Sequence, residues 1–92
     1  MSIGSLPVAG FKVCAANFSG NVKTAQSGAS LGFLCTVTGT LNAYDDAAVG
    51  TTTPIVTALG VTAGTYYPLP FCFASGFNLV LSGGAAGTLA YV

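Results

Sequence analysis

Gly and Pro interrupt the chain so often that no window of eleven or more residues shows helical periodicity free of either residue. In a helix interior Gly costs about 1 kcal/mol relative to Ala, and Pro costs about 3 kcal/mol. Between the interruptions lie seven or eight short segments with strand-like composition, separated by Gly-rich turns. This spacing predicts an all-β fold, either a small β-sandwich or a jelly-roll-like domain. The pattern carries no strand order, so jelly-roll and immunoglobulin-like topologies both stay open.

The longest expected strand covers residues 31–44, where apolar and polar side chains alternate with a period of two. One side of this segment consists of Phe33, Cys35, Val37, Gly39, Leu41 and Ala43. The other side carries three threonines, which we assign to solvent because Thr suits the exposed face of a strand. Gly39 in the middle predicts a bulge or a bend.

Residues 64–84 hold half of the six Phe residues, and we expect the rest of the chain to pack around them. We interpret this stretch as a hairpin, with one strand ending at Phe73, a tight turn at 74–76 and a second strand over 77–82. A last strand over 88–92 is expected to pair with that second strand.

Shorter strands are expected over 11–18, 21–26 and 51–61, the last with Pro54 at a strand start or on an edge because Pro cannot donate to a ladder. Turns or loops are expected at 19–21, 27–30, 45–50 and 62–64. The predicted core residues are Phe33, Val37, Leu41, Phe71, Phe73, Phe77, Leu79 and Leu81. Residues 1–10 are expected to form an extended N-terminal arm, and residues 11–92 a single β-sandwich domain.

Charge is scarce, because Lys12, Lys23, Asp45 and Asp46 are the only ionic side chains and make up 4% of the residues. Globular domains carry roughly 25%. The surface is therefore covered either by Thr, Ser, Asn and Gly or by other subunits. An apolar fraction of 52% favours the second possibility, since a small domain has little interior. We expect a homo-oligomer or a subunit of a larger assembly.

The same scarcity of basic residues argues against nucleic-acid binding, which depends on neutralising phosphates. No apolar run approaches the roughly 20 residues of a membrane helix, so no membrane partner is expected. The first residues lack a charged segment followed by an apolar one, and we expect no signal peptide.

Few residues here are suited to catalysis, and we expect no enzyme and no cofactor. The chain has no His, which removes His-based triads and metal sites. Asp45 and Asp46 are adjacent in an expected loop, so we interpret them as turn residues that cap backbone amides. Cys14, Cys35 and Cys72 have no C-x-x-C spacing and are interpreted as buried free thiols.

Two segments are candidates for contact with other subunits. One is the apolar arm with Ile3, Leu6, Pro7 and Val8, and the other is the Tyr66–Tyr67 pair. Aromatic side chains supply much of the energy of interfaces and of cores, so core packing is the alternative for the two tyrosines.

Three segments, 41–46, 59–71 and 73–83, give residues 40–92 a pattern that resembles small virion structural proteins of tailed bacteriophages. These proteins are of similar size, rich in Gly, Ala and Thr, and poor in charge. The resemblance implies a β-rich, non-enzymatic virion subunit made in the host cytoplasm, most simply a capsid decoration or cement protein. Such proteins contact the major capsid protein or other virion subunits and are often trimers. The alternative is a host-binding module on a tail or fibre that stacks Tyr44, Tyr66 and Tyr67 on glycans.

Overall fold

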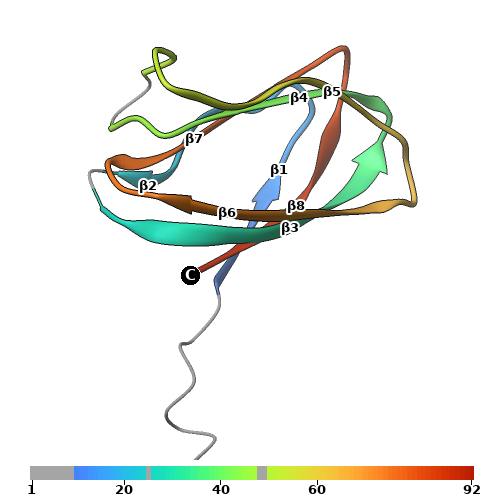
Figure 1. Cartoon of the computed structure of the whole chain (residues 1–92). Coiled ribbons are helices and arrows are strands. Elements are labelled where there is room, and N and C mark those ends of the chain that lie inside the picture. The colour runs from blue at the N-terminus through green and yellow to red at the C-terminus, as the bar shows by residue number, and fades with distance from the viewer. Residues whose placement is uncertain (1–9, 25, 48–49) are drawn as a thin grey trace, which may run out of the picture.

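A computed structural model describes residues 10–24, 26–47 and 50–92 of the chain. These residues form eight strands and no helix, as expected (Figure 1). The strands are β1 (Gly10–Cys14), β2 (Ser19–Thr24), β3 (Gly28–Val37), β4 (Gly39–Tyr44), β5 (Pro54–Val61), β6 (Tyr66–Phe73), β7 (Gly76–Ser82) and β8 (Ala86–Tyr91). The expected arm lies outside the described residues except for Gly10, which opens β1.

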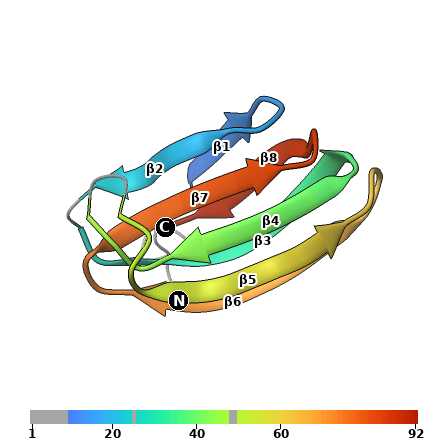
Figure 2. The ribbon, with the colours of Figure 1, turned by 90° about the horizontal axis from the view of Figure 1, so that it is seen from above.

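The strands form two four-stranded antiparallel sheets that pack face to face (Figure 2). Sheet A has the order β1-β8-β3-β6, and sheet B has the order β2-β7-β4-β5. Four of the pairings are nested, namely β1 with β8, β2 with β7, β3 with β6 and β4 with β5. Eight strands paired in this way in two sheets define a jelly roll.

The register shows that the nested pairs belong to one continuous ribbon. Phe11 pairs with Ala90 at one end of the chain, and Gly39 pairs with Val61 near the middle. In all four nested pairings the two residue numbers add to between 98 and 101. The chain is therefore a long hairpin centred on residue 50 that is rolled into two layers.

This arrangement corrects the two hairpins that we expected near the C-terminus. Strand β6 lies in sheet A and β7 in sheet B, so they do not pair. Phe73 and Phe77 instead face each other across the core, with ring centroids 5.1 Å apart. The last strand likewise pairs with β1 and β3 rather than with β7. Only β4 and β5 pair with their neighbour in sequence.

The expected strand over 31–44 is two strands, because the chain passes from sheet A to sheet B at Thr38. The predicted bend at Gly39 is confirmed. A Cβ atom at this position would lie 2.5 Å from the Ala85 backbone nitrogen, so only Gly permits so close an approach. Phe33 and Leu41 nevertheless face the same core from the two sheets.

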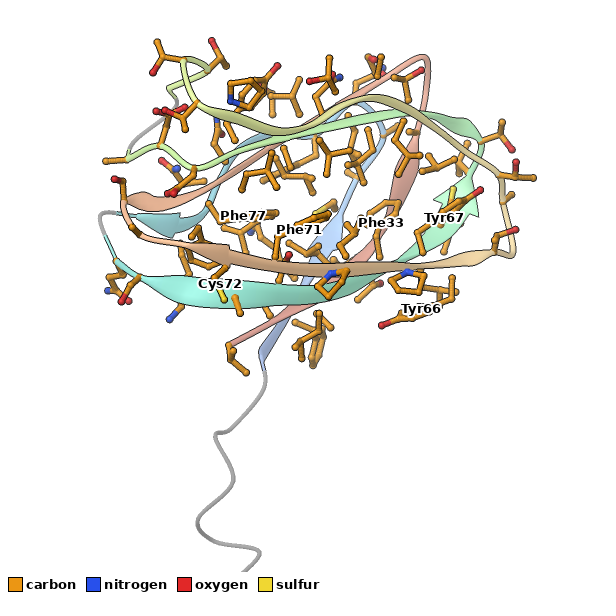
Figure 3. The ribbon with its side chains drawn as sticks, viewed as in Figure 1. Phe33, Tyr66, Tyr67, Phe71, Cys72 and Phe77 are labelled. Carbon is orange, nitrogen blue, oxygen red and sulfur yellow. The ribbon has the colours of Figure 1, made fainter. Side chains whose placement is uncertain are left out.

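Six of the eight predicted core residues are buried, and Val37 and Phe71 are not. Val37 is 48% exposed because the register of β3 against β8 shifts between Cys35 and Val37, which breaks the alternation. Phe71 points between the sheets (Figure 3), yet it stays 38% exposed because β6 is an edge strand.

Several element boundaries also differ from expectation. The first turn lies at Ala15–Phe18 rather than at 19–21, because Asn17 adopts a left-handed conformation with φ of 59° and its side chain accepts a hydrogen bond from the Gly84 amide. Residues 28–30, expected in a loop, begin β3. Pro54 starts β5, which is an edge strand of sheet B, as predicted.

Candidate interaction surface

The outer side of sheet A begins at β1, where two large apolar side chains point to solvent. Phe11 is 69% exposed and Val13 is 70% exposed. The alternate residues take the inward side, since Cys14 is buried and the Lys12 ammonium lies 5.4 Å from the centre of the Phe18 ring. The only charged residue in the strands of sheet A is thus directed to the Phe18 ring, away from Phe11 and Val13.

Cross-strand pairing extends this apolar side over all four strands of the sheet. One row runs from Val13 through Thr88 and Leu34 to Tyr66. The next row runs from Phe11 through Ala90 and Gly32 to Pro68. Leu31, Leu34 and Tyr66 are 41%, 44% and 53% exposed. We call these residues the apolar face, namely Phe11, Val13, Leu31, Leu34, Tyr66, Pro68, Thr88 and Ala90.

The two predicted tyrosines point in opposite directions, as neighbours in a strand must. Tyr66 lies on the apolar face (Figure 3), with its phenol ring so close to Gly32 that a Cβ atom there would collide with it. Tyr67 packs against the core, and its hydroxyl oxygen accepts a hydrogen bond of 2.8 Å from the Thr62 amide.

The other predicted contact residues, Ile3, Leu6, Pro7 and Val8, lie outside the described residues. Phe11, Val13, Leu31 and Leu34 were not among the predicted contact residues. The sequence does indicate that Phe11 and Val13 face outward. Cys is usually buried, and side chains alternate along a strand, so Phe11 and Val13 lie on the side opposite to Cys14. Leu34 falls by alternation on the same side of the expected strand as the three threonines, and that side was assigned to solvent.

The outer side of sheet B presents different chemistry. Its rows pair Ser19 with Val80 and Asn42, and Ser82 with Thr40 and Gly60. Asn78, which pairs with Asn21 and Tyr44, is buried and donates a hydrogen bond of 2.6 Å to the Gly50 carbonyl oxygen. The Asn42 side chain accepts a hydrogen bond of 2.8 Å from the Ala58 amide, where the backbone is left-handed. We call this side the amide face, because amide and hydroxyl groups predominate there.

The only two carboxylate side chains of the chain follow β4 and hold two different turns. Asp46 accepts hydrogen bonds of 2.9 Å from the Thr52 and Thr53 amides and from the Thr52 hydroxyl. Asp45 reaches the turn between β6 and β7, where it accepts bonds of 3.0 and 2.8 Å from the Ala74 and Ser75 amides. The interpretation of both residues as amide caps is confirmed.

These hydrogen bonds favour the charged carboxylates. The bond from the Ala74 amide lowers the pKa of Asp45, with a further contribution from Ser75. The bond from the Thr53 amide lowers the pKa of Asp46. A lowered pKa is the opposite of what a general base at neutral pH requires, and the two side chains hold different turns instead of converging.

The three thiols fall into two groups. Cys14 and Cys35 are buried, and burial raises the pKa of Cys14 despite the neighbouring Lys12 charge. Cys72 is exposed on the outer side of sheet A (Figure 3), because it occupies an outward position of the edge strand β6. The expectation that all three are buried was therefore wrong for Cys72.

Within the described ranges, no three His, Cys, Asp or Glu side chains gather as metal ligands, and the surface has no pocket. No helix in this part of the chain could cross a membrane. Comparisons with known protein families, curated proteins and solved structures found no match to the chain. The apolar face is the feature of the described surface that is best suited to binding another molecule.

Proposed function

We propose that this protein is a non-enzymatic structural subunit of a bacteriophage particle, specifically a capsid decoration or cement protein. The observation that carries the proposal is the apolar face. Five large apolar or aromatic side chains, Phe11, Val13, Leu31, Leu34 and Tyr66, are between two-fifths and seven-tenths exposed on one side of one sheet. Burying such surface against another subunit contributes about 25 cal/mol per Å².

The fold and the sequence pattern support the same proposal. Viral capsid proteins make frequent use of the eight-stranded jelly roll, although the fold alone does not define a function. The resemblance of residues 40–92 to small phage virion proteins supplies the particular context. The partners would be the major capsid protein or other virion subunits. A subunit that binds the assembled shell, and not its free components, stabilises the shell by mass action.

Two measurements on purified particles test this proposal. Quantitative mass spectrometry should find the chain in a number comparable to that of the major capsid protein. Stripping it should lower the temperature at which the particles release their DNA, and adding the purified chain back should restore that temperature. A few copies per particle, or an unchanged release temperature, would contradict the decoration role.

The contact of the N-terminal arm with other subunits stays a prediction, and a separate experiment tests it. A variant that lacks residues 2–8 should keep the melting temperature of the full chain and bind stripped particles less tightly. Equal binding by the two proteins would remove the arm from the interface.

A second candidate function is a host-binding module on a tail or fibre. One observation favours it, namely that Tyr66 is exposed beside Pro68 on a side without charge, and aromatic rings of this kind stack on sugars. Tyr44 lies on the amide face and Tyr67 points to the core, so the three tyrosines do not form one platform. Purified protein should then bind host cells, Tyr66→Ala should abolish binding, and Tyr66→Phe should retain it.

A further inference from the structure

We propose that the apolar face binds the apolar face of a second copy of this chain, so that the free protein is a two-fold symmetric dimer. This inference rests on the proposed function and refines it, because it names a second copy, rather than the capsid shell, as the partner of this face in the free protein. It is carried by the area of the face, by its lack of charge and by the order of large and small side chains across it.

The area is sufficient for a dimer. A fully exposed aromatic side chain presents about 150–250 Å², so Phe11 and Tyr66, each more than half exposed, together offer about 180–300 Å². Val13, Leu31 and Leu34 bring the face to on the order of 500 Å², near the upper end of the largest patch on ordinary monomers. Pro68, Thr88 and Ala90 add a smaller area, because Thr88 and Ala90 are only partly exposed, so the face reaches the lower end of the roughly 600–1,000 Å² that specific interfaces take from each partner.

The electrostatics favour an uncharged partner, and a second copy of the same face is one. The apolar face contains no charged residue. A charged partner would lose hydration there without gaining an ion pair. An uncharged, self-complementary surface fits instead, and two-fold dimers bring one patch against itself. Two identical faces therefore meet with no like-charge repulsion at any position.

The order of side-chain sizes also allows two copies to interlock. Strand β8 lies between β1 and β3 and presents only Ala90 and Thr88 outward. Its neighbours carry the larger side chains Phe11, Val13 and Leu34. Adjacent strands are about 4.8 Å apart, so the rows of larger side chains on β1 and β3 are roughly 10 Å apart with smaller residues between them. A copy turned by 180° can place its Phe11 over Ala90, as inner faces interdigitate in β-sandwiches.

The test is the mass of the whole chain in solution, measured by light scattering coupled to size exclusion over a range of concentrations. The native protein is expected at twice the 9.0 kDa of one chain, falling to a single chain on dilution. Val13→Lys is expected at the mass of one chain at every concentration, because it places a charge in the interface while Lys is well tolerated on an exposed edge strand.

A matched pair of variants separates the two sides of the molecule. Val13→Thr and Val80→Thr make the same chemical change on the apolar face and on the amide face. The first is expected to raise the dimer dissociation constant at least several-fold, and the second to leave it unchanged. A native protein that stays at 9.0 kDa, a closed trimer, or equal effects of the two variants would overturn the inference.

A measurement on the native sequence covers the case in which a variant fails to fold. Protein labelled with 4-fluorophenylalanine gives one fluorine resonance per Phe, and Phe11→Leu identifies the resonance of Phe11. That resonance is expected to shift with concentration, whereas the resonance of buried Phe33 is not. A Phe11 resonance independent of concentration would contradict the dimer. Because the particle measurements do not depend on this result, a monomer that still restores stripped particles would leave the decoration role standing without the dimer.

Discussion

The outer sides of sheets A and B have the same pairing geometry and expose opposite chemistry. The apolar face presents Phe11, Val13 and Leu34, whereas the amide face presents Asn42, Thr40 and Ser19. Charge does not distinguish them, because the strands of each sheet contain a single charged residue, Lys12 or Lys23. A nearly uncharged chain can therefore still expose different chemistry on its two sides. Hydrogen-bonding side chains predominate on the outer side of sheet B, and large apolar side chains on the outer side of sheet A.

Within β3, the adjacent residues Phe33 and Leu34 belong to the core and to the apolar face respectively. Phe33→Ala is expected to cost about 3–5 kcal/mol of unfolding free energy, because it leaves a cavity in the core. Leu34→Ala should cost about 1 kcal/mol or less, because the Leu34 side chain is 44% exposed in a single copy. Urea denaturation at a protein concentration low enough to keep the chain monomeric measures both values. Similar losses would show that Leu34 is part of the folded core rather than of a contact surface.

A second test compares two glycines of sheet B. Gly39→Ala should cost about 1–3 kcal/mol, since the added methyl group would overlap the Ala85 backbone and the Ser82 carbonyl oxygen. Gly60→Ala should change stability by no more than about 0.5 kcal/mol, because no heavy atom lies within 4 Å of the new methyl group. Thermal melts of the two variants compare them. Equal melting temperatures would contradict the close crossing between the sheets at Gly39.

Acid should lower the stability that Asp45 and Asp46 give to the two turns, and it should not change the apolar face, which has no carboxylate. The folded-state pKa of Asp45 and Asp46 is lowered, so the stability they contribute is complete above the unfolded value of about 4. That stability is lost as pH falls through the lowered pKa values. Urea midpoints should therefore stay level from pH 7 to pH 5 and fall below pH 4, with a smaller fall for Asp45→Asn. A midpoint that begins to fall near pH 6 would contradict this assignment.

Salt should produce the smallest change. Screening weakens ion pairs, and the apolar face has none, so raising NaCl from 0.05 to 0.5 M should alter the dimer dissociation constant by less than about twofold. Sulfate, which strengthens apolar burial, should tighten the dimer. Sedimentation equilibrium in the two salts makes the comparison. If NaCl dissociates the dimer, charges outside the apolar face hold the two copies together.

The sequence was sufficient for the fold class and for most of the core. Gly and Pro exclude long helices by local chemistry, and the period-two pattern identifies Phe33 and Leu41 without tertiary information. Val37 was misassigned because a register shift against β8 is a property of the pairing, which a single strand does not encode. The prediction of a hairpin over residues 71–82 was wrong for a related reason. A short turn between two apolar segments is compatible with pairing in one sheet or with crossing to the other.

The candidate surface was harder to predict than the core. Tyr66 was identified because it is aromatic, but the strand order that places it in one row with Leu34 and Val13 is not visible in the chain. These residues lie far apart in sequence and become neighbours only through the pairings of β8 with β1 and β3 and of β3 with β6. The carboxylates were simpler, since adjacent Asp residues in a loop commonly cap nearby amides.

The ribbon centred on residue 50 also sets the order in which the protein can fold. Strands β4 and β5 can pair as soon as both have left the ribosome, while β1 must wait for β8, the last of the eight strands to be synthesised. Such a chain has a high contact order, which makes folding slow. Since β8 joins β1 to β3, the apolar face does not exist until synthesis has passed residue 91. The proposed dimer can therefore form only between chains whose synthesis has passed β8.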